Sequence, residues 1–234
     1  MTVDLWGSIQ GTIVIWVVSA ALAIILGLVL AAGSLHPHRT VHLLARTGVN
    51  LTRGVPTSVL VIMAGMGMLR IATPPNLPHL YPGTPASFQH IAWGIVLALG
   101  FGSAGHLAEI FSAARSTLGQ YRLEQMTVLG LSPLGRIALL VRECAAVALP
   151  PTGARMVHHL HNTAFAALFP VTDLFGFVQG RSSATFRVFE AILIGCLIYL
   201  ALSGLIWLAT RLLEAAYAPP TPGRAKRRRV FQWS

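Results

Sequence analysis

The sequence has few charged residues of either sign, and acidic residues are especially rare. Asp, Glu, Lys and Arg make up 10% of the 234 residues, and only seven residues are acidic. Soluble domains carry about a quarter charged residues, whereas 54% of this chain is hydrophobic and its mean hydropathy is +0.67. This shortage of charge excludes an ordinary soluble domain and predicts a membrane protein.

Cysteine is scarce, and the motifs of enzymes are missing. The two cysteines, Cys144 and Cys196, lie in apolar segments, which favours buried thiols over a disulfide scaffold. No Gly-x-x-x-x-Gly-Lys phosphate-binding loop occurs, so we expect that the chain does not hydrolyse ATP by itself. No Ser/His/Asp order or cysteine pair indicates catalysis, and we expect no enzyme activity and no bound cofactor.

Long apolar runs fill most of the chain. A helix needs roughly 20 apolar residues to cross a bilayer. The runs predict an all-α membrane protein with five transmembrane helices, at about residues 10–32, 56–70, 91–111, 137–169 and 188–210. Pro150-Pro151 must bend or break the fourth of these helices. We expect residues 1–218 to form the membrane domain and residues 219–234 to form a basic tail.

The positions of the basic residues predict the orientation. Thirteen of the seventeen lie in one set of loops and at the C-terminus, and the Pro-rich loop 73–89 on the opposite side has none. The positive-inside rule then places the N-terminus outside and the C-terminus in the cytoplasm. The basic run 224–229 is better explained by attraction to anionic lipid than by nucleic acid, so no nucleic-acid partner is expected.

A cytoplasmic segment between the third and fourth spans is longer than a simple helix connection needs. Leu123, Met126 and Leu129 recur at three-residue spacing, which gives one face of a short helix. Gly130 suits a helix C-terminus, and Ser132-Pro133 can start another helix. The segment is either a docking surface for a partner or an amphipathic helix on the membrane surface, and periodicity alone does not decide.

Several motifs together resemble a known family, the polar amino acid uptake permeases of bacterial ABC importers. The matching residues near the family's cytoplasmic EAA loop are Ala108-Glu109-Ile110-Phe111, Glu124, Leu129-Gly130-Leu131-Ser132 and Leu149-Pro150-Pro151. Residues 160–164 and 171–174 are most similar to permeases for histidine, lysine, arginine and related opines. Arg53, Gly54 and Pro56 resemble the Arg-Gly-Thr-Pro start of the family's second span.

The resemblance implies a type I ABC importer permease in the bacterial cytoplasmic (inner) membrane, for amino acids or amino-acid-like solutes. Its partners would be a dimer of ATP-binding subunits that hold ATP and Mg²⁺, a second permease subunit and an extracytoplasmic solute-binding protein. The coupling loop to the ATPase would contain Glu124, Leu129, Gly130, Leu131 and Ser132. Gln125 and Met126 stand where the family has two alanines, so we hypothesise a heterodimer whose other permease has a more regular loop.

Polar residues inside a span are costly and are candidates for the translocation pathway. Arg155 should lie well inside the membrane, where it pairs with Glu143 or Glu190 or meets a substrate carboxylate. His161, Asn162 and Thr163 are expected to line a polar cavity or to stabilise the bent fourth span. Asp173 is expected to contact the binding protein or an amino group, or to cap a helix.

Two further patterns have simple interpretations. In the cluster His158-His159-x-His161, only residues 158 and 161 share a helix face, so at most two ligands come together and no metal site is expected. Gly65 and Gly67 indicate close helix packing. A secondary transporter, marked by inverted repeats, and a non-transporting membrane scaffold are the competing interpretations of the chain.

Overall fold

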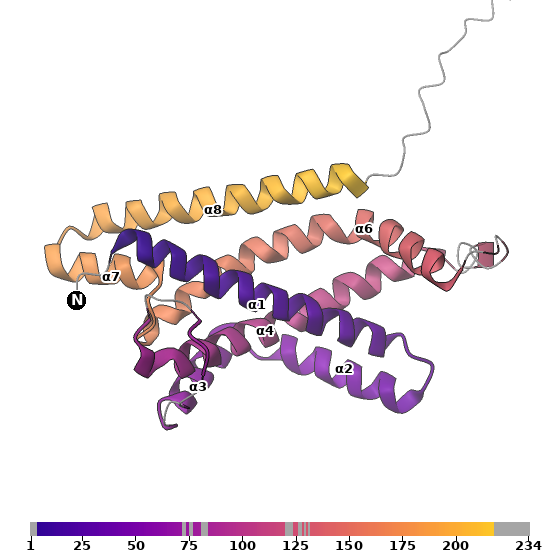
Figure 1. The fold of residues 1–234 in the computed structure, drawn as a ribbon, viewed down its shortest axis with the longest axis horizontal. Coiled ribbons are helices and arrows are strands. Elements are labelled where there is room, and N and C mark those ends of the chain that lie inside the picture. The colour runs from indigo at the N-terminus through magenta and orange to yellow at the C-terminus, as the bar shows by residue number, and fades with distance from the viewer. Residues whose placement is uncertain are drawn as a thin grey trace, which may run out of the picture.

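The computed structural model describes residues 4–71, 74, 77–80, 84–119, 124, 125, 128, 130 and 132–217. Every regular element in these residues is a helix, which confirms the predicted all-α class. Four long helices, α1 (Leu5–Ser34), α4 (Gln89–Ser116), α6 (Pro133–Asn162) and α8 (Val188–Tyr217), run along the long axis of the molecule (Figure 1). Each provides a stretch that is long and apolar enough to cross a membrane.

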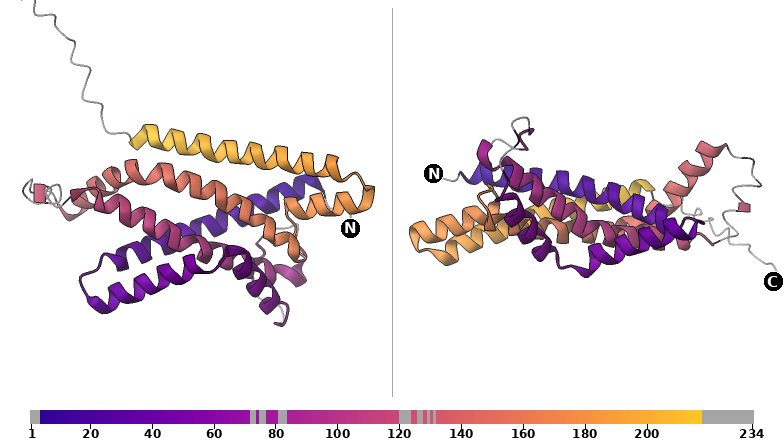
Figure 2. Two further views of the ribbon diagram at one scale, coloured as in Figure 1. Left: turned by 180° about the vertical axis from the view of Figure 1, so that it is seen from behind. Right: turned by 90° about the horizontal axis from the view of Figure 1, so that it is seen from below.

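The two ends of the molecule contain different elements. The start of α1 and the short helix α7 (Leu174–Thr185) lie at one end, as Figures 1 and 2 show. The turn from α1 to α2 (Arg39–Gly54), the end of α4 and the start of α6 lie toward the other end. The end of α8 also lies opposite the start of α1 (Figure 1), which fits the five predicted crossings. Which end faces the cytoplasm stays a prediction.

The second span differs from the sequence prediction. Helix α3 covers only Thr57–Met68, and its 12 residues reach about 18 Å, well short of a hydrocarbon core of about 30 Å. Residues 39–54, which lie between the first two predicted spans, form helix α2. Helices α2 and α3 reach the length of a span only together, with a bend of 91° between them. The break lies at Pro56, which lacks an N–H group, and the preceding Val55 is extended.

The Pro150-Pro151 pair does not break α6. The helix is continuous from Pro133 to Asn162. Of the two expected effects, a bend or a break, the break is therefore wrong, and the bend stays a prediction. Irregular geometry begins only at the following 3-10 helix, η2 (Thr163–Leu168). Membrane helices tolerate proline where neighbouring helices and local adjustments satisfy the freed carbonyls. At its start, Ser132 Oγ accepts a hydrogen bond from the Gly135 N–H group at 3.2 Å, which confirms the predicted start at Ser132-Pro133.

Helix α4 forms the centre of the bundle. It packs against α1, α2, α3 and α6. In its most apolar stretch 72% of the residues are buried, compared with 11% in α8. Small residues allow these close contacts: a Cβ atom added at Gly27 of α1 would lie 2.8 Å from Leu107 Cβ of α4. The apolar core next to α3 contains Ile15, Val61, Ile91, Ile95 and Leu99. Helix α8 therefore leaves most of its surface for lipid or for partner subunits.

Candidate functional site

A buried histidine joins three helices near the middle of the bundle. His159 of α6 is 0% exposed. Its Nδ1 atom lies 2.7 Å from Ser103 Oγ of α4, and its Nε2 atom lies 2.8 Å from Ser19 Oγ of α1. Ser103 is the fifteenth of the 28 residues of α4, so the network lies halfway along a spanning helix.

The hydrogen bonds of this network run in one direction. Arg155 can only donate, and its Nη2 group donates to Ser103 Oγ at 3.0 Å. The Ser103 hydroxyl proton is then free to donate to Nδ1 of His159. In turn, the Nε2–H group of His159 donates to Ser19 Oγ, and Ser19 donates to the Ile15 carbonyl at 2.6 Å. Both ring nitrogens of His159 thus have a serine hydroxyl as partner and are unavailable to a metal.

Arg155 has different partners from those expected. Its Nη2 group also donates to the Gly102 carbonyl at 3.3 Å, and among the described residues no carboxylate forms an ion pair with it. The predicted ion pair of Arg155 with Glu190 does not form, because Glu190 Oε2 binds Arg187 Nη1 at 3.4 Å. Arg155 forms no ion pair with Glu143 either. Two neutral acceptors do not compensate the positive charge of a guanidinium, and the buried Nε atom has no partner in the described part of the chain.

The side of α6 that bears Arg155 is a polar stripe in a membrane helix. Arg155 is half-buried, whereas His158 and His161 are exposed. His106 of α4 is half-buried and has Arg155, Arg53 and His158 as its charged or titratable neighbours. Charged and polar side chains inside a membrane face a bundle interior or a water-filled cavity rather than lipid. We call His106, Arg155 and His158 the cationic face.

The other predicted pathway residues are spread over two regions. The Nε2 atom of His161 lies 3.2 Å from Ser203 Oγ of α8, and its ring contacts the Tyr199 ring edge to face. Asn162 is 8% exposed and Thr163 is buried; the Thr163 hydroxyl donates to the Leu160 carbonyl at 2.7 Å, at the end of α6. Only His161 therefore continues the polar stripe of Arg155 and His158.

Asp173 is a buried helix cap. Its carboxylate accepts hydrogen bonds from the N–H groups of Phe175 at 3.0 Å and of Gly176 at 3.2 Å. Burial raises the pKa of Asp173 to about 7, against the opposing effect of these two backbone donors. It also lines a cavity of about 380 Å³ between η1 (Ala86–Phe88), the η2–α7 connection and α7. Capping, one of the expected roles, is what these contacts show.

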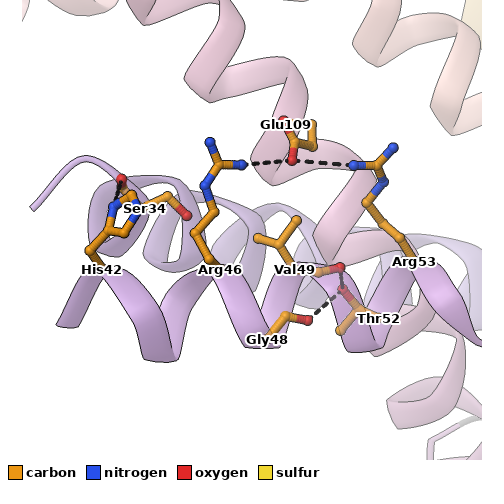
Figure 3. A network of polar contacts seen from close by, with 8 residues as sticks. All are labelled: Ser34, His42, Arg46, Gly48, Val49, Thr52, Arg53 and Glu109. Atoms are coloured by element: carbon orange, nitrogen blue, oxygen red, sulfur yellow. Dashed lines mark hydrogen bonds and ion pairs between the residues drawn. The ribbon is translucent and has the colours of Figure 1, made fainter. Parts of the chain in front are cut away.

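The residues of the second-span start motif anchor α2 to α4. Arg53 Nη1 lies 3.2 Å from Glu109 Oε1, and Arg46 Nη1 lies 3.0 Å from the same oxygen, as Figure 3 shows. Gly54 ends α2, and Pro56 stands immediately before α3. The motif thus marks a helix break and an ion-pair clamp between two helices.

The predicted coupling loop is described only in part. Leu129 and Leu131, like Leu123 and Met126, lie outside the described residues, so the expected helical face is untested. Glu124 is exposed. Gly130 has φ +62°, a left-handed conformation that suits a glycine at a helix end. Ser132 caps α6.

Sequence reasoning missed the members of the network that come from α1 and α4. Ser19 and Ser103 are small polar residues in long apolar runs, and nothing in a single sequence says which neighbouring helix they face. From the sequence, His159 is a candidate only for metal binding. The sequence does place His159 on a different side of the helix from His158, because adjacent residues lie 100° apart. Among the described residues, no three His, Cys, Asp or Glu side chains are placed to hold a metal.

Comparison with known proteins identifies relatives over most of the chain. Residues 23–218 match the family described as "binding-protein-dependent transport system inner membrane component". The probable amino-acid permease protein YxeN of Bacillus subtilis (strain 168) is 26% identical over 199 residues, covering 85% of this chain and 84% of that protein. The histidine/lysine/arginine/ornithine transport system permease protein HisM of Escherichia coli (strain K12) is 26% identical over 196 residues, covering 82% and 80%.

Solved structures share the fold. A chain of an amino acid ABC transporter crystallised with histidines superposes with a TM-score of 0.71 at 20% identity, over 92% of this chain and 100% of that one. A chain of the MetNI methionine ABC transporter in an inward-facing conformation gives a TM-score of 0.64 at 13% identity, over 92% and 94%. The helices described above therefore have the type I importer permease arrangement.

Proposed function

Because the chain belongs to the family of binding-protein-dependent transport system inner membrane components, we propose that it is the permease subunit of an ATP-driven importer for amino acids or amino-acid-like solutes. It is a multi-pass protein of the bacterial inner membrane. The names of its relatives include an amino-acid permease and a permease for histidine, lysine, arginine and ornithine. Two different relatives thus support the same broad solute class.

The observation that carries the proposal is the uncompensated guanidinium of Arg155 halfway across the bundle. Its partners are a hydroxyl and a carbonyl, and the exposed His158 and His161 extend the same polar stripe along α6. Such a stripe cannot face lipid without a cost of several kcal/mol. A water-filled pathway shared with a second permease subunit satisfies it, and an amino acid supplies the carboxylate that Arg155 lacks.

The proposal includes three kinds of partner. A pair of ATP-binding subunits, which hold ATP and Mg²⁺, contacts the segment from Glu124 to Ser132. A second permease subunit covers the polar stripe of α6. An extracytoplasmic binding protein delivers the solute at the end of the molecule that contains α7, where the cavity beside Asp173 lies. The left-handed Gly130 supports a sharp turn in the coupling segment.

Transport by the purified complex tests the proposal. The chain is affinity-purified from its native host with its bound subunits, identified by mass spectrometry, and reconstituted into liposomes with the binding protein. We expect a pair of ATPase subunits, a second and different permease, and amino-acid uptake that requires ATP. Copies of this chain as the sole permease would contradict the heterodimer, and uptake driven by an ion gradient without ATP would favour a secondary transporter. A complex that moves no amino acid would refute the proposed function.

A further inference from the structure

The sign of the charges on the cationic face restricts the solute. Within the described spanning helices, the charged residue near the middle of the bundle is Arg155, a cation. Three acidic residues of the spanning helices lie toward the helix ends: Glu109 is held by Arg46 and Arg53, Glu190 by Arg187 and Glu214 by Arg211. Glu143 lies in the first half of α6, whereas Arg155 lies in the second half. A cationic solute side chain therefore meets no described carboxylate beside Arg155.

The groups of the cationic face are arranged to bind an anion. Ser103 and Gly102 fix one end of the Arg155 guanidinium through Nη2, and Ser103 is itself held by the buried His159. The guanidinium is thus oriented before any solute arrives, which reduces the entropy lost on binding. Because Nη2 already has two acceptors and Nε is buried, Nη1 is the group that can donate a charge-assisted hydrogen bond to a carboxylate. Nearby, His106 and His158 are further hydrogen-bond donors, with Arg155 as their common neighbour.

We propose that the cationic face, His106, Arg155 and His158, binds a solute through its carboxylates and selects amino acids of net negative charge. This inference rests on the proposed function and specifies its solute class. It differs from the solutes in the name of the relative HisM, which are mostly cationic. An acidic amino acid has two carboxylates for these three groups, whereas a second positive charge on the solute is repelled by Arg155.

Direct binding to the membrane complex tests this inference without the selectivity of the binding protein. The purified complex in detergent, free of binding protein, is titrated with L-glutamate, L-glutamine and L-arginine, and affinity is measured by calorimetry and by the shift of the thermal unfolding midpoint. We expect L-glutamate to bind at least about tenfold more tightly than L-arginine, with L-glutamine between them. Equal or tighter binding of L-arginine, or no binding of L-glutamate, overturns the inference.

Three variants locate the binding to this face. Arg155→Gln removes the charge and should weaken L-glutamate binding at least about tenfold, the range expected for a lost charge-assisted hydrogen bond. Arg155→Lys should retain part of the affinity, because it keeps the charge but not the planar group that Ser103 and Gly102 hold in place. Arg181→Gln, at an exposed arginine of α7, should leave the affinity unchanged. L-glutamate binding that is insensitive to Arg155→Gln overturns the inference.

A further variant covers the case in which Arg155→Gln does not fold. His158 is exposed and makes no hydrogen bond within the described part of the chain, so His158→Ala should assemble normally. Because it removes a donor from the cationic face, it should weaken L-glutamate binding. The transport assay separates the two proposals: ATP-dependent uptake of L-arginine without binding of L-glutamate refutes the solute class and leaves the importer intact. Absence of ATP-dependent uptake of every amino acid refutes the importer itself.

Discussion

The hydroxyl group of Ser103 on α4 lies 2.7 Å from Nδ1 of His159 on α6. The same hydroxyl oxygen accepts a hydrogen bond from Arg155, one turn before His159 on α6. The buried imidazole also reaches Ser19 of α1. The network therefore has two effects: it joins three helices, and it fixes the guanidinium that we place in the pathway. The proposed binding site therefore links solute binding to stability at this point.

Ser103→Ala should destabilise the protein and loosen Arg155. The substitution leaves Nδ1 of the buried His159 without its partner, so we expect the free energy of unfolding to fall by about 1–2 kcal/mol, within the range for interhelical hydrogen bonds in membranes. Reversible unfolding in mixed micelles measures the loss. Ser203→Ala, which removes the hydrogen bond to His161 near the surface, is the control and should cost less. Equal losses of unfolding free energy in the two variants would contradict a larger contribution from the buried network.

Two glycines of α3 give a matched pair. A Cβ atom at Gly65 would overlap the ring of Phe169, whereas a Cβ atom at Gly67 meets nothing within 4 Å. We expect Gly65→Ala to destabilise the protein by about 1–3 kcal/mol through displacement of the ring. Gly67→Ala should be neutral or slightly stabilising, because alanine favours the helix. Thermal unfolding of both variants in detergent measures the difference, and a destabilised Gly67→Ala would contradict the packing seen here.

The same two glycines show what a single sequence can and cannot predict. Their position in an apolar run correctly predicted close packing at Gly65, but the prediction was wrong for Gly67, because composition does not say which side of a helix meets a neighbour. Likewise, the lack of charge between Asp4 and Arg39 predicted the first span. The apolar run after Pro56 predicted a span that α3 alone cannot form, because a run of residues does not reveal that α2 packs on α4.

Arg155 illustrates the same limit for the candidate site. Its depth in the membrane followed from the length of the fourth apolar run, and an intramembrane charge is a functional candidate by default. Its partners did not follow, because the expected carboxylates are charged residues and the actual acceptors are a serine hydroxyl and a backbone carbonyl. Every residue has a carbonyl group, so composition gives no signal for such a contact.

The ion-pair clamp on Glu109 should hold α2 in place rather than stabilise the whole bundle. Both arginine side chains are largely exposed, at 46% and 44%, so each pair is worth only about 0–1 kcal/mol. We expect Glu109→Gln to change the unfolding midpoint little and to increase amide hydrogen exchange in residues 39–54. Glu190→Gln, which removes the exposed pair with Arg187, should leave exchange in α2 unchanged. Unaltered exchange in Glu109→Gln would show that packing alone fixes α2.

Asp173 should make stability depend on pH. Its pKa in the folded state is about 7, above the ordinary value of 3.8, so the folded protein binds this proton more tightly than the unfolded chain does. The free energy of unfolding should therefore fall as the pH rises from about 4 to about 7, by up to about 1.4 kcal/mol per pH unit. Asp173→Asn keeps a good helix cap and should flatten this dependence of the unfolding midpoint. An identical pH profile for the variant would contradict the assignment.

Gly130 should couple ATP hydrolysis to transport through its backbone conformation. It has φ +62°, where a residue with a Cβ atom costs about 1–2 kcal/mol, although asparagine adopts this region more readily than alanine. If the turn positions the coupling segment on the ATPase, ATP-driven uptake should decrease in the order Gly130, Gly130→Asn, Gly130→Ala, with subunit assembly retained. Gly204→Ala, where a Cβ atom meets open space in α8, controls for loss of a glycine as such. Gly130→Asn and Gly130→Ala keep the Glu124 and Ser132 side chains. Uptake that does not change in either variant would therefore place the coupling contact elsewhere in the chain.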